Sequence, residues 1–375
     1  MKPRKSKALI GSGLAIIVAL ASTFLLLRHR TTEKDNPLTI GVILPLTGDA
    51  ASYGVDCRRG IEMGVANIEK QQGRTIDVQF EDSKADPATA VAAFNKIVDV
   101  DHAKAVIGDM FSSTTLAIAP LAQQGHVLLL TPTAADERIP ATGDFIYSIY
   151  PPAQSEGDFM AQKLSQASLG RAVVLYQNQV ATKSIADAFA LGVSRRGGKV
   201  ALQESIPSET SSYRSLLTKV ATVDPTTIYI SAYRDPVAML IVMGREMGIN
   251  TQWATQSTLY DAKALADYPG KLNGVLVSGP YFDTHNASEA ISEFTNEYRS
   301  RYGVPPSVWS AYGYDAANIL IHALLKAEQD KTSPNAELSG HEFSGLTGNT
   351  EIRTDRSVVK QMMLYRVADN QFVKE

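Results

Sequence analysis

A run of four hydroxyl side chains, Ser112, Ser113, Thr114 and Thr115, follows a short apolar segment at residues 105–108 and precedes a segment with helical spacing. Hydroxyl groups at the start of a helix can cap the free backbone N–H groups and still face a ligand. The helix dipole favours a carboxylate or another acceptor group at the same place. Plain capping requires only one of the four, so the run favours a binding site for a small polar molecule over capping alone.

A second turn, made of small residues, follows the next apolar segment at residues 126–130. It contains Thr133, Ala134 and Ala135, and small side chains there let a ligand approach the backbone closely. In an open parallel sheet, ligands collect beyond the carboxyl ends of the strands. We therefore expect the two turns to form one side of a binding site.

Two tyrosines are placed to complete such a site. Tyr53 lies at the start of the first helical segment, and Tyr233 follows an apolar strand at residues 227–230 in the second half of the chain. A tyrosine ring can cover an apolar group while its hydroxyl binds a polar one. For Tyr53, packing at the helix start is an equally good interpretation of the sequence.

Side chains that would carry out catalysis, or hold a metal or cofactor, are missing from the sequence pattern. No two of the six histidines have metal-ligand spacing, and the single cysteine, Cys57, allows neither a disulfide nor a thiolate cluster. There is no phosphate-binding loop, dinucleotide-binding motif or nucleophile elbow. With 36 Lys and Arg against 39 Asp and Glu, the charge gives no reason to expect nucleic acid. We expect a non-enzymatic protein without a cofactor or metal.

The N-terminus predicts export from the cytoplasm. Residues 8–27 are uncharged and apolar, and at about 1.5 Å per residue they could cross a bilayer of roughly 30 Å. Basic residues before this stretch predict that the rest of the chain lies outside. Residues 19–21 resemble a signal-peptide cleavage site, but cleavage there would leave an apolar tail, so we favour a membrane anchor. The expected location is the periplasm or the outer face of the inner membrane, with residues 1–30 as anchor or signal segment and 31–37 as linker.

Beyond the linker, short β-branched runs alternate with amphipathic helical segments. The first series has strands at 38–44, 76–80, 105–108 and 126–130, with helices at 54–70, after Pro87 and at 116–124. The second has strands at 172–176, 199–203 and 227–230, with helices at 155–166, 185–195, 211–220 and 237–247. This alternation is typical of right-handed crossovers and mostly parallel sheets covered on both faces. The sequence predicts two similar α/β lobes.

Several short motifs occur in a specific order along almost all of the exported chain. They are residues 40–48 with Tyr53-Gly54, Asp82, Asp86-Pro87, 106–108 with 112–115, 131–134, 314–317 and 343–348. In this order, from about Leu38 to Val373, the chain resembles the periplasmic leucine/isoleucine/valine-binding proteins, the type I solute-binding components of ABC importers.

The resemblance implies two Rossmann-like lobes that are joined by three crossings and close on a small ligand. The first lobe would comprise residues 38–147 and 279–355, and the second 148–278 and 356–375, with crossings near Tyr150, Gly279 and Asp355. It also implies an ABC importer permease as partner. By the same likeness, the ligand carboxylate is held at Ser112, Thr133 and Ala134, the cleft is lined by Tyr53 and Tyr233, and the side-chain pocket is formed by Met110 and Phe111.

The chain departs from that family at positions that line the cleft, including two that hold the ligand's ammonium group. The acidic residue aligns near Ser257, a threonine aligns with Ala135, and a cleft tyrosine aligns with Ala181. A buried ammonium without a counter-charge is costly. Unless Asp261 or another acid replaces the missing one, an amide, a keto or carboxylic acid, or a larger polar molecule fits better than an aliphatic amino acid.

The sequence therefore predicts a solute-binding protein that captures a small polar metabolite, resembling an amino acid, amide or carboxylate, for an ABC importer. The alternative is a membrane-tethered sensor or regulator that uses the same fold to contact another protein of the cell envelope. An uncleaved anchor would favour this alternative somewhat.

Overall fold

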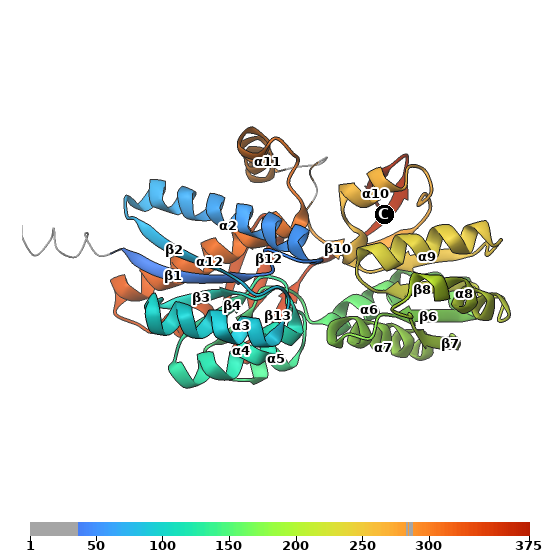
Figure 1. Cartoon of the computed structure of the whole chain (residues 1–375), viewed down its shortest axis with the longest axis horizontal. Coiled ribbons are helices and arrows are strands. Elements are labelled where there is room, and N and C mark those ends of the chain that lie inside the picture. Colours follow the sequence, from blue (N-terminus) through green and yellow to red (C-terminus); the bar gives the residue numbers. More distant parts are fainter. Residues whose placement is uncertain (1–36, 283, 285–287) are drawn as a thin grey trace, which may run out of the picture.

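The computed structural model describes residues 37–282, 284 and 288–375, which form two α/β lobes connected in the middle of the molecule (Figure 1). The expected fold of two lobes with mostly parallel sheets is thus confirmed. The expected anchor or signal segment, residues 1–30, and nearly all of the linker lie outside the described residues. Among the helices of the described part, none combines the length and the apolar character that a membrane crossing requires.

The sheet of the first lobe has the strand order β2-β1-β3-β4-β5, and all of its strands are parallel. Its inner strands are short apolar runs buried on both faces, as in parallel sheets between helix layers. The strands are β1 (Leu38–Leu44), β2 (Ile76–Asp82), β3 (Ala105–Gly108), β4 (Leu128–Thr131) and β5 (Ile146–Ser148). The helices are α2 (Ala51–Gln72), α3 (Pro87–Asn95), α4 (Ser112–Gly125), α5 (Arg138–Ala141), α11 (Glu289–Tyr302), α12 (Val308–Asp330) and α13 (Pro334–Leu338).

The sheet of the second lobe has the order β15-β14-β10-β9-β8-β6-β7. Its strands are parallel except for β14, which runs antiparallel to β10, and β15, which runs antiparallel to β14. The strands are β6 (Ala172–Tyr176), β7 (Val200–Ser205), β8 (Thr227–Ser231), β9 (Gln252–Thr255), β10 (Leu276–Pro280), β14 (Met362–Ala368) and β15 (Gln371–Lys374). The helices are α6 (Ala153–Lys163), α7 (Val180–Arg195), α8 (Tyr213–Ala221), α9 (Arg234–Glu246) and α10 (Ala262–Asp267), and the short turn η4 (Ser257–Leu259) follows β9.

The described chain passes between the lobes at three places: between β5 and α6, between β10 and α11, and just before β14. A small antiparallel sheet of β11 (His341–Gly345), β12 (Gly348–Ile352) and β13 (Val358–Lys360) precedes the last passage. Asp315 of α12 ties this sheet to the first lobe by accepting the backbone N–H groups of Leu346 and Thr347 at 2.8 and 2.9 Å. β13 still pairs with β12, and Gln361 alone separates it from β14.

Helices α2 and α12 pack closely although they come from opposite ends of the chain (Figure 1). The close approach depends on glycine at two contacts. A Cβ atom on Gly60 would lie 1.8 Å from the carbonyl oxygen of Ser310, and one on Gly313 would lie 2.2 Å from that of Cys57. The helix pair therefore needs residues without a side chain where the backbones meet.

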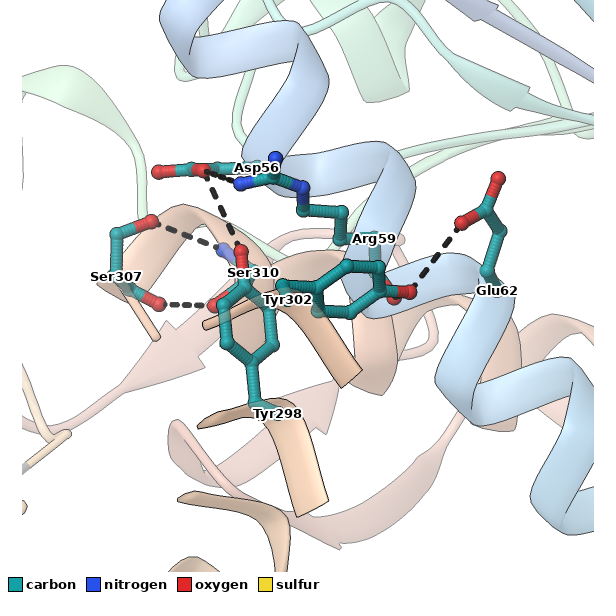
Figure 2. A network of polar contacts seen from close by, with 7 residues as sticks. All are labelled: Asp56, Arg59, Glu62, Tyr298, Tyr302, Ser307 and Ser310. Carbon is teal, nitrogen blue, oxygen red and sulfur yellow. Dashed lines mark hydrogen bonds and ion pairs between the residues drawn. The ribbon is translucent and has the colours of Figure 1, made fainter. Parts of the chain in front are cut away.

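A polar network fixes α11 against α2 (Figure 2). The hydroxyl of Tyr298 donates to Asp56 at 3.4 Å, and that of Tyr302 donates to Glu62 at 3.3 Å. The guanidinium of Arg59 pairs with Asp56 and lies 5.0 Å from the centre of the Tyr302 ring. These contacts hold the segment that follows the second passage between the lobes.

One local expectation is wrong. The sequence placed Ser112, Ser113, Thr114 and Thr115 in a loop before a helix starting near residue 116, whereas α4 already begins at Ser112. The hydroxyls of Thr114 and Thr115 donate to the backbone carbonyls of Phe111 and Asp109 at 2.9 and 3.1 Å. These two side chains are therefore used to fix the first helical turn.

Candidate ligand-binding cleft

A small cavity lies between the two lobes. Its volume is about 60 Å³, several times the roughly 10–15 Å³ that one water molecule needs, so it suits a small molecule. Residues from both lobes line it: Tyr53, Met110, Phe111, Ser112, Thr133, Ala135, Tyr150, Glu156, Ala181, Thr182, Ile185, Tyr233, Gln256, Ser257, Thr258 and Trp309.

The first lobe contributes the carboxyl ends of β3 and β4 and the start of α4. The hydroxyl of Ser112 accepts the backbone N–H of Ala135 at 3.3 Å, and the hydroxyl of Thr133 donates to the carbonyl of Met110 at 3.0 Å. These bonds join the two turns, which explains why residues far apart in the sequence form one wall. The N-terminus of α4 gives this wall a positive potential that suits an acceptor group of a ligand.

The turn between β3 and α4 is shaped by the fully buried carboxylate of Asp109. It accepts the backbone N–H groups of Met110 and, at 3.3 Å, of Phe111. Burial raises the pKa of Asp109 to about 6, although these hydrogen bonds and those with nearby hydroxyls act in the opposite direction. Asp109 is not among the lining residues, and its role is to position Met110 and Phe111.

Aromatic rings from both lobes meet at the cavity. The ring of Tyr233, at the start of α9, lies 5.4 Å from that of Phe111 and 6.5 Å from that of Tyr53, measured between ring centres. Trp309 of α12 packs on Tyr53 at 5.5 Å. Burial raises the pKa of the Tyr233 phenol, which therefore stays neutral at ordinary pH. These rings close the cavity and hold the lobes together by direct contact.

The second lobe supplies a polar wall around Glu156 of α6. Its carboxylate accepts the backbone N–H of Ser257 at 2.6 Å and the hydroxyl of Ser278 at 2.9 Å. The hydroxyls of Ser257 and Tyr150 lie 2.7 Å apart. Burial raises the pKa of Glu156, against the effect of the hydrogen bonds from Ser257 and Ser278. A buried acid therefore borders the cavity.

Comparison with known proteins identifies the fold and its family. The profile of the family described as periplasmic binding protein matches residues 37–371, which is most of the chain. The chain belongs to this family of periplasmic binding proteins. The family and the fold are those of non-enzymatic solute-binding proteins, related to the leucine/isoleucine/valine-binding proteins that the sequence motifs indicated.

Individual relatives of this periplasmic binding protein are distant in sequence. A leucine-, isoleucine-, valine-, threonine- and alanine-binding protein of Pseudomonas aeruginosa is 23% identical over 322 residues, which cover 83% of this chain and 84% of the relative. A crystal structure of a leucine-binding protein from Thermotoga maritima matches 90% of this chain and 97% of its own, with 22% identity and a TM-score of 0.80. A solute-binding protein of an ABC transporter from Rhodopseudomonas palustris, in complex with 3,4-dihydroxybenzoic acid, covers 90% and 96% with 18% identity and a TM-score of 0.81.

The structure of this periplasmic binding protein brings most of the expected site residues together at one cavity. Ala134 is the exception: it is buried behind the wall, where its backbone N–H donates to Thr131 and its carbonyl accepts from Ser148. The alternative acid, Asp261, caps α10 and lies outside the cavity lining. The expected residues that line it are Tyr53, Met110, Phe111, Ser112, Thr133, Ala135, Tyr233 and Ser257.

Other lining residues were missed in the sequence, most notably Glu156 and Trp309. Glu156 lies four residues before the fully buried Met160 and therefore on the same face of α6. A carboxylate on the apolar face of a helix is a sequence signal that could have indicated a functional residue. Trp309 lies in the first turn of α12, more than two hundred residues after Tyr53. No local sequence pattern connects these two residues. In the described residues, no cluster of three His, Cys, Asp or Glu side chains could hold a metal ion.

Proposed function

We propose that this periplasmic binding protein captures a small polar metabolite, resembling an amino acid, an amide or a carboxylate, and delivers it to an ABC importer permease. The observation that carries the proposal is the cavity itself, since it lies between the lobes and takes its lining from both. A molecule bound there would be contacted from two sides at once. The range of ligands named for the relatives, from leucine to a dihydroxybenzoic acid, supports a small organic solute.

Binding and closure are linked in this proposal. Tyr53 and Phe111 of the first lobe touch Tyr233 of the second, so separating the lobes would open the cavity to solvent. A ligand that contacts both lobes binds the closed form more tightly and shifts the population towards it. The permease would then receive the closed, loaded form. The chemistry required is recognition alone, with no change in the solute.

The proposed location is the outer side of the inner membrane, in keeping with the periplasmic family. We propose that residues 8–27 either anchor the chain there or direct export before cleavage. Immunoblots of membrane and periplasmic fractions test the anchor. A membrane-bound protein of full mass supports it, and a periplasmic protein lighter by about 2 kDa, near the mass of twenty residues, contradicts it.

A thermal-shift screen against small metabolites tests the binding function. Ligand at a hundred times its dissociation constant adds about 2.7 kcal/mol of stability, which moves the melting temperature visibly. For a hit, the double variant Ser112→Ala, Tyr233→Ala should bind at least about tenfold more weakly, a loss of about 1.4 kcal/mol. Unchanged affinity would place the ligand elsewhere. A screen without hits, together with capture of an envelope protein by the purified chain, would favour a tethered sensor or regulator instead.

A further inference from the structure

The carboxylate of Glu156 is the acidic group that borders the cleft. Its side chain is 1% exposed and projects from the first turn of α6, whose N-terminus favours negative charge. Burying a carboxylate is costly unless a positive charge or hydrogen bonds compensate it. The neighbours of Glu156 therefore indicate what the cleft is built to bind.

The two carboxylate oxygens are used unequally. Oε1 accepts the N–H of Ser257 and the hydroxyl of Ser278, at 2.6 and 2.9 Å. Within the described residues, Oε2 has one hydrogen bond, from the hydroxyl of Ser257, and it is long at 3.3 Å. An ionised carboxylate offers about four acceptor positions. Oε2 thus retains the capacity to accept a strong hydrogen bond from a donor in the cavity.

The described groups around Glu156 supply hydrogen bonds but no positively charged side chain. The ionisable side chains that face it are the phenols of Tyr150, Tyr229 and Tyr312, in addition to the hydroxyls of Ser257 and Ser278. Throughout the described part of the chain, no Lys, Arg or His forms an ion pair with Glu156. Beyond the hydrogen bonds and the N-terminus of α6, a positive charge to balance Glu156 would therefore have to come from a ligand in the cleft.

We propose that Glu156 binds a cationic nitrogen of the ligand, so that the cleft selects solutes that carry an ammonium or a similar group. This inference rests on the proposed solute-binding function and narrows its ligand class. The charged nitrogen would donate to Oε2 and supply the missing counter-charge. Solutes of the same shape without that nitrogen would leave the carboxylate either uncompensated or protonated.

Matched ligand pairs test the inference on the wild-type protein. The panel contains amino acids and amines, each paired with the analogue that lacks the nitrogen, for example L-leucine with 4-methyl-2-oxopentanoate and benzylamine with benzyl alcohol, and also includes benzoate. Calorimetry should detect binding of at least one amine and a loss of about 30-fold or more in its analogue, the factor that corresponds to about 2 kcal/mol. Preference for the analogues or for benzoate would overturn the inference and leave the solute-binding function intact. Binding of no compound would count against both.

Three variants separate ligand binding from a structural role. For the amine that binds, Glu156→Gln should lower affinity by about 30-fold or more, because the charge is lost and the shape is kept. Asp158→Asn is the matched control: it removes a carboxylate charge from the same helix, where Asp158 pairs with Arg196 outside the cavity lining, so affinity should change by less than about threefold. Equal losses in the two variants would contradict direct contact between Glu156 and the amine. Should Glu156→Gln fail to fold, Glu156→Asp keeps the charge but moves it back by one methylene group, and undiminished affinity would contradict direct contact.

The pH dependence gives an independent readout. Burial raises the pKa of Glu156, and a cation binds the ionised form, so binding in acid requires release of a proton. Affinity for the amine should fall with decreasing pH in the wild type and fall less in Glu156→Gln, in which Asp109, with a pKa of about 6, still titrates. Equal pH dependence in both proteins would overturn the proposal.

Discussion

Asp82, at the end of β2, holds the loop that leads from β1 to Tyr53. Its carboxylate accepts the backbone N–H groups of Leu46, Thr47 and Lys84 at 2.8, 3.3 and 2.9 Å, and the hydroxyl of Thr47 at 2.5 Å. Partial burial alone would raise the pKa of Asp82, but these hydrogen bonds outweigh it and lower the pKa below its ordinary value. A single side chain thus fixes the approach to one wall of the cleft.

We expect Asp82→Asn to lower the free energy of unfolding by about 1 kcal/mol at pH 7, since hydrogen bonds to a charged group are replaced by weaker ones and solvent screens an exposed charge. Because the pKa of Asp82 in the folded protein is lower than 3.8, its ordinary value, the ionised side chain stabilises the fold at pH values above 3.8. This stabilisation is lost as the pH falls through the lowered pKa. The difference between variant and wild type should therefore shrink between pH 5 and pH 3. Urea unfolding at both pH values measures it.

The control for Asp82→Asn is Asp77→Asn on the same strand. Asp77 accepts a hydrogen bond from the side chain of Gln79 at 2.9 Å and holds no loop. This substitution should change stability by less than about 0.5 kcal/mol. A difference for Asp82→Asn that persists unchanged at pH 3 would show that its charge is not the cause.

At the scale of elements, the first lobe depends on the contact between α2 and α12. The backbones meet at Gly60 and Gly313. The second lobe repeats this arrangement between α6 and α7, where a Cβ atom on Gly157 would lie 2.1 Å from the carbonyl oxygen of Ile185. In each lobe, the close approach of two helices, α2 and α12 or α6 and α7, therefore depends on glycine at the contact.

Gly60→Ala should destabilise the protein by about 2–3 kcal/mol, because the added methyl group meets backbone that cannot move without separating the helices. Gly125→Ala, at the end of α4, is the matched control. Its Cβ atom would meet nothing closer than a Val127 methyl group at 3.5 Å, so stability should stay the same or rise slightly. Denaturant unfolding measures the stability of both variants. If Gly60→Ala destabilises the protein no more than Gly125→Ala does, the helix contact at Gly60 can relax to accept a methyl group.

The sequence pattern located elements where periodicity is strong and local. Strand β1 and strand β6 have the expected bounds because they are continuous apolar runs. The start of α4 was missed, since hydroxyl residues favour caps and loops unless, like Thr115, they bond to the preceding turn. The contacts of Glu156 with Ser257 and of Trp309 with Tyr53 join residues more than a hundred positions apart, and no local propensity contains that information.

At the scale of the whole molecule, the described contacts belong to a closed form. The aromatic contacts of Tyr233 join the lobes at the cavity. The second and third passages run side by side, because Met362 of β14 pairs with Pro280 of β10. Opening of the lobes would therefore break the ring contacts while this pair of strands stays joined.

Removing the ring of Tyr233 should favour the open form. Each aromatic pair contributes about 0.5–1.5 kcal/mol beyond its buried area, and Tyr233→Ala loses the pairs with Tyr53 and Phe111. Small-angle X-ray scattering without added ligand should give the variant a larger radius of gyration than the wild type. Saturating ligand should remove most of the difference. Identical radii in the free proteins would show that other contacts keep the lobes together.

The pairing of α2 with α12 also constrains how the chain is made. Helix α2 is translated early, but its partner α12 follows only after most of the second lobe, from α6 to β10, and the second lobe itself waits for β14 and β15, which come after α12. Neither lobe can therefore complete its core before part of the other lobe has been synthesised. The apolar face of α2 must stay uncovered while most of the second lobe is being made.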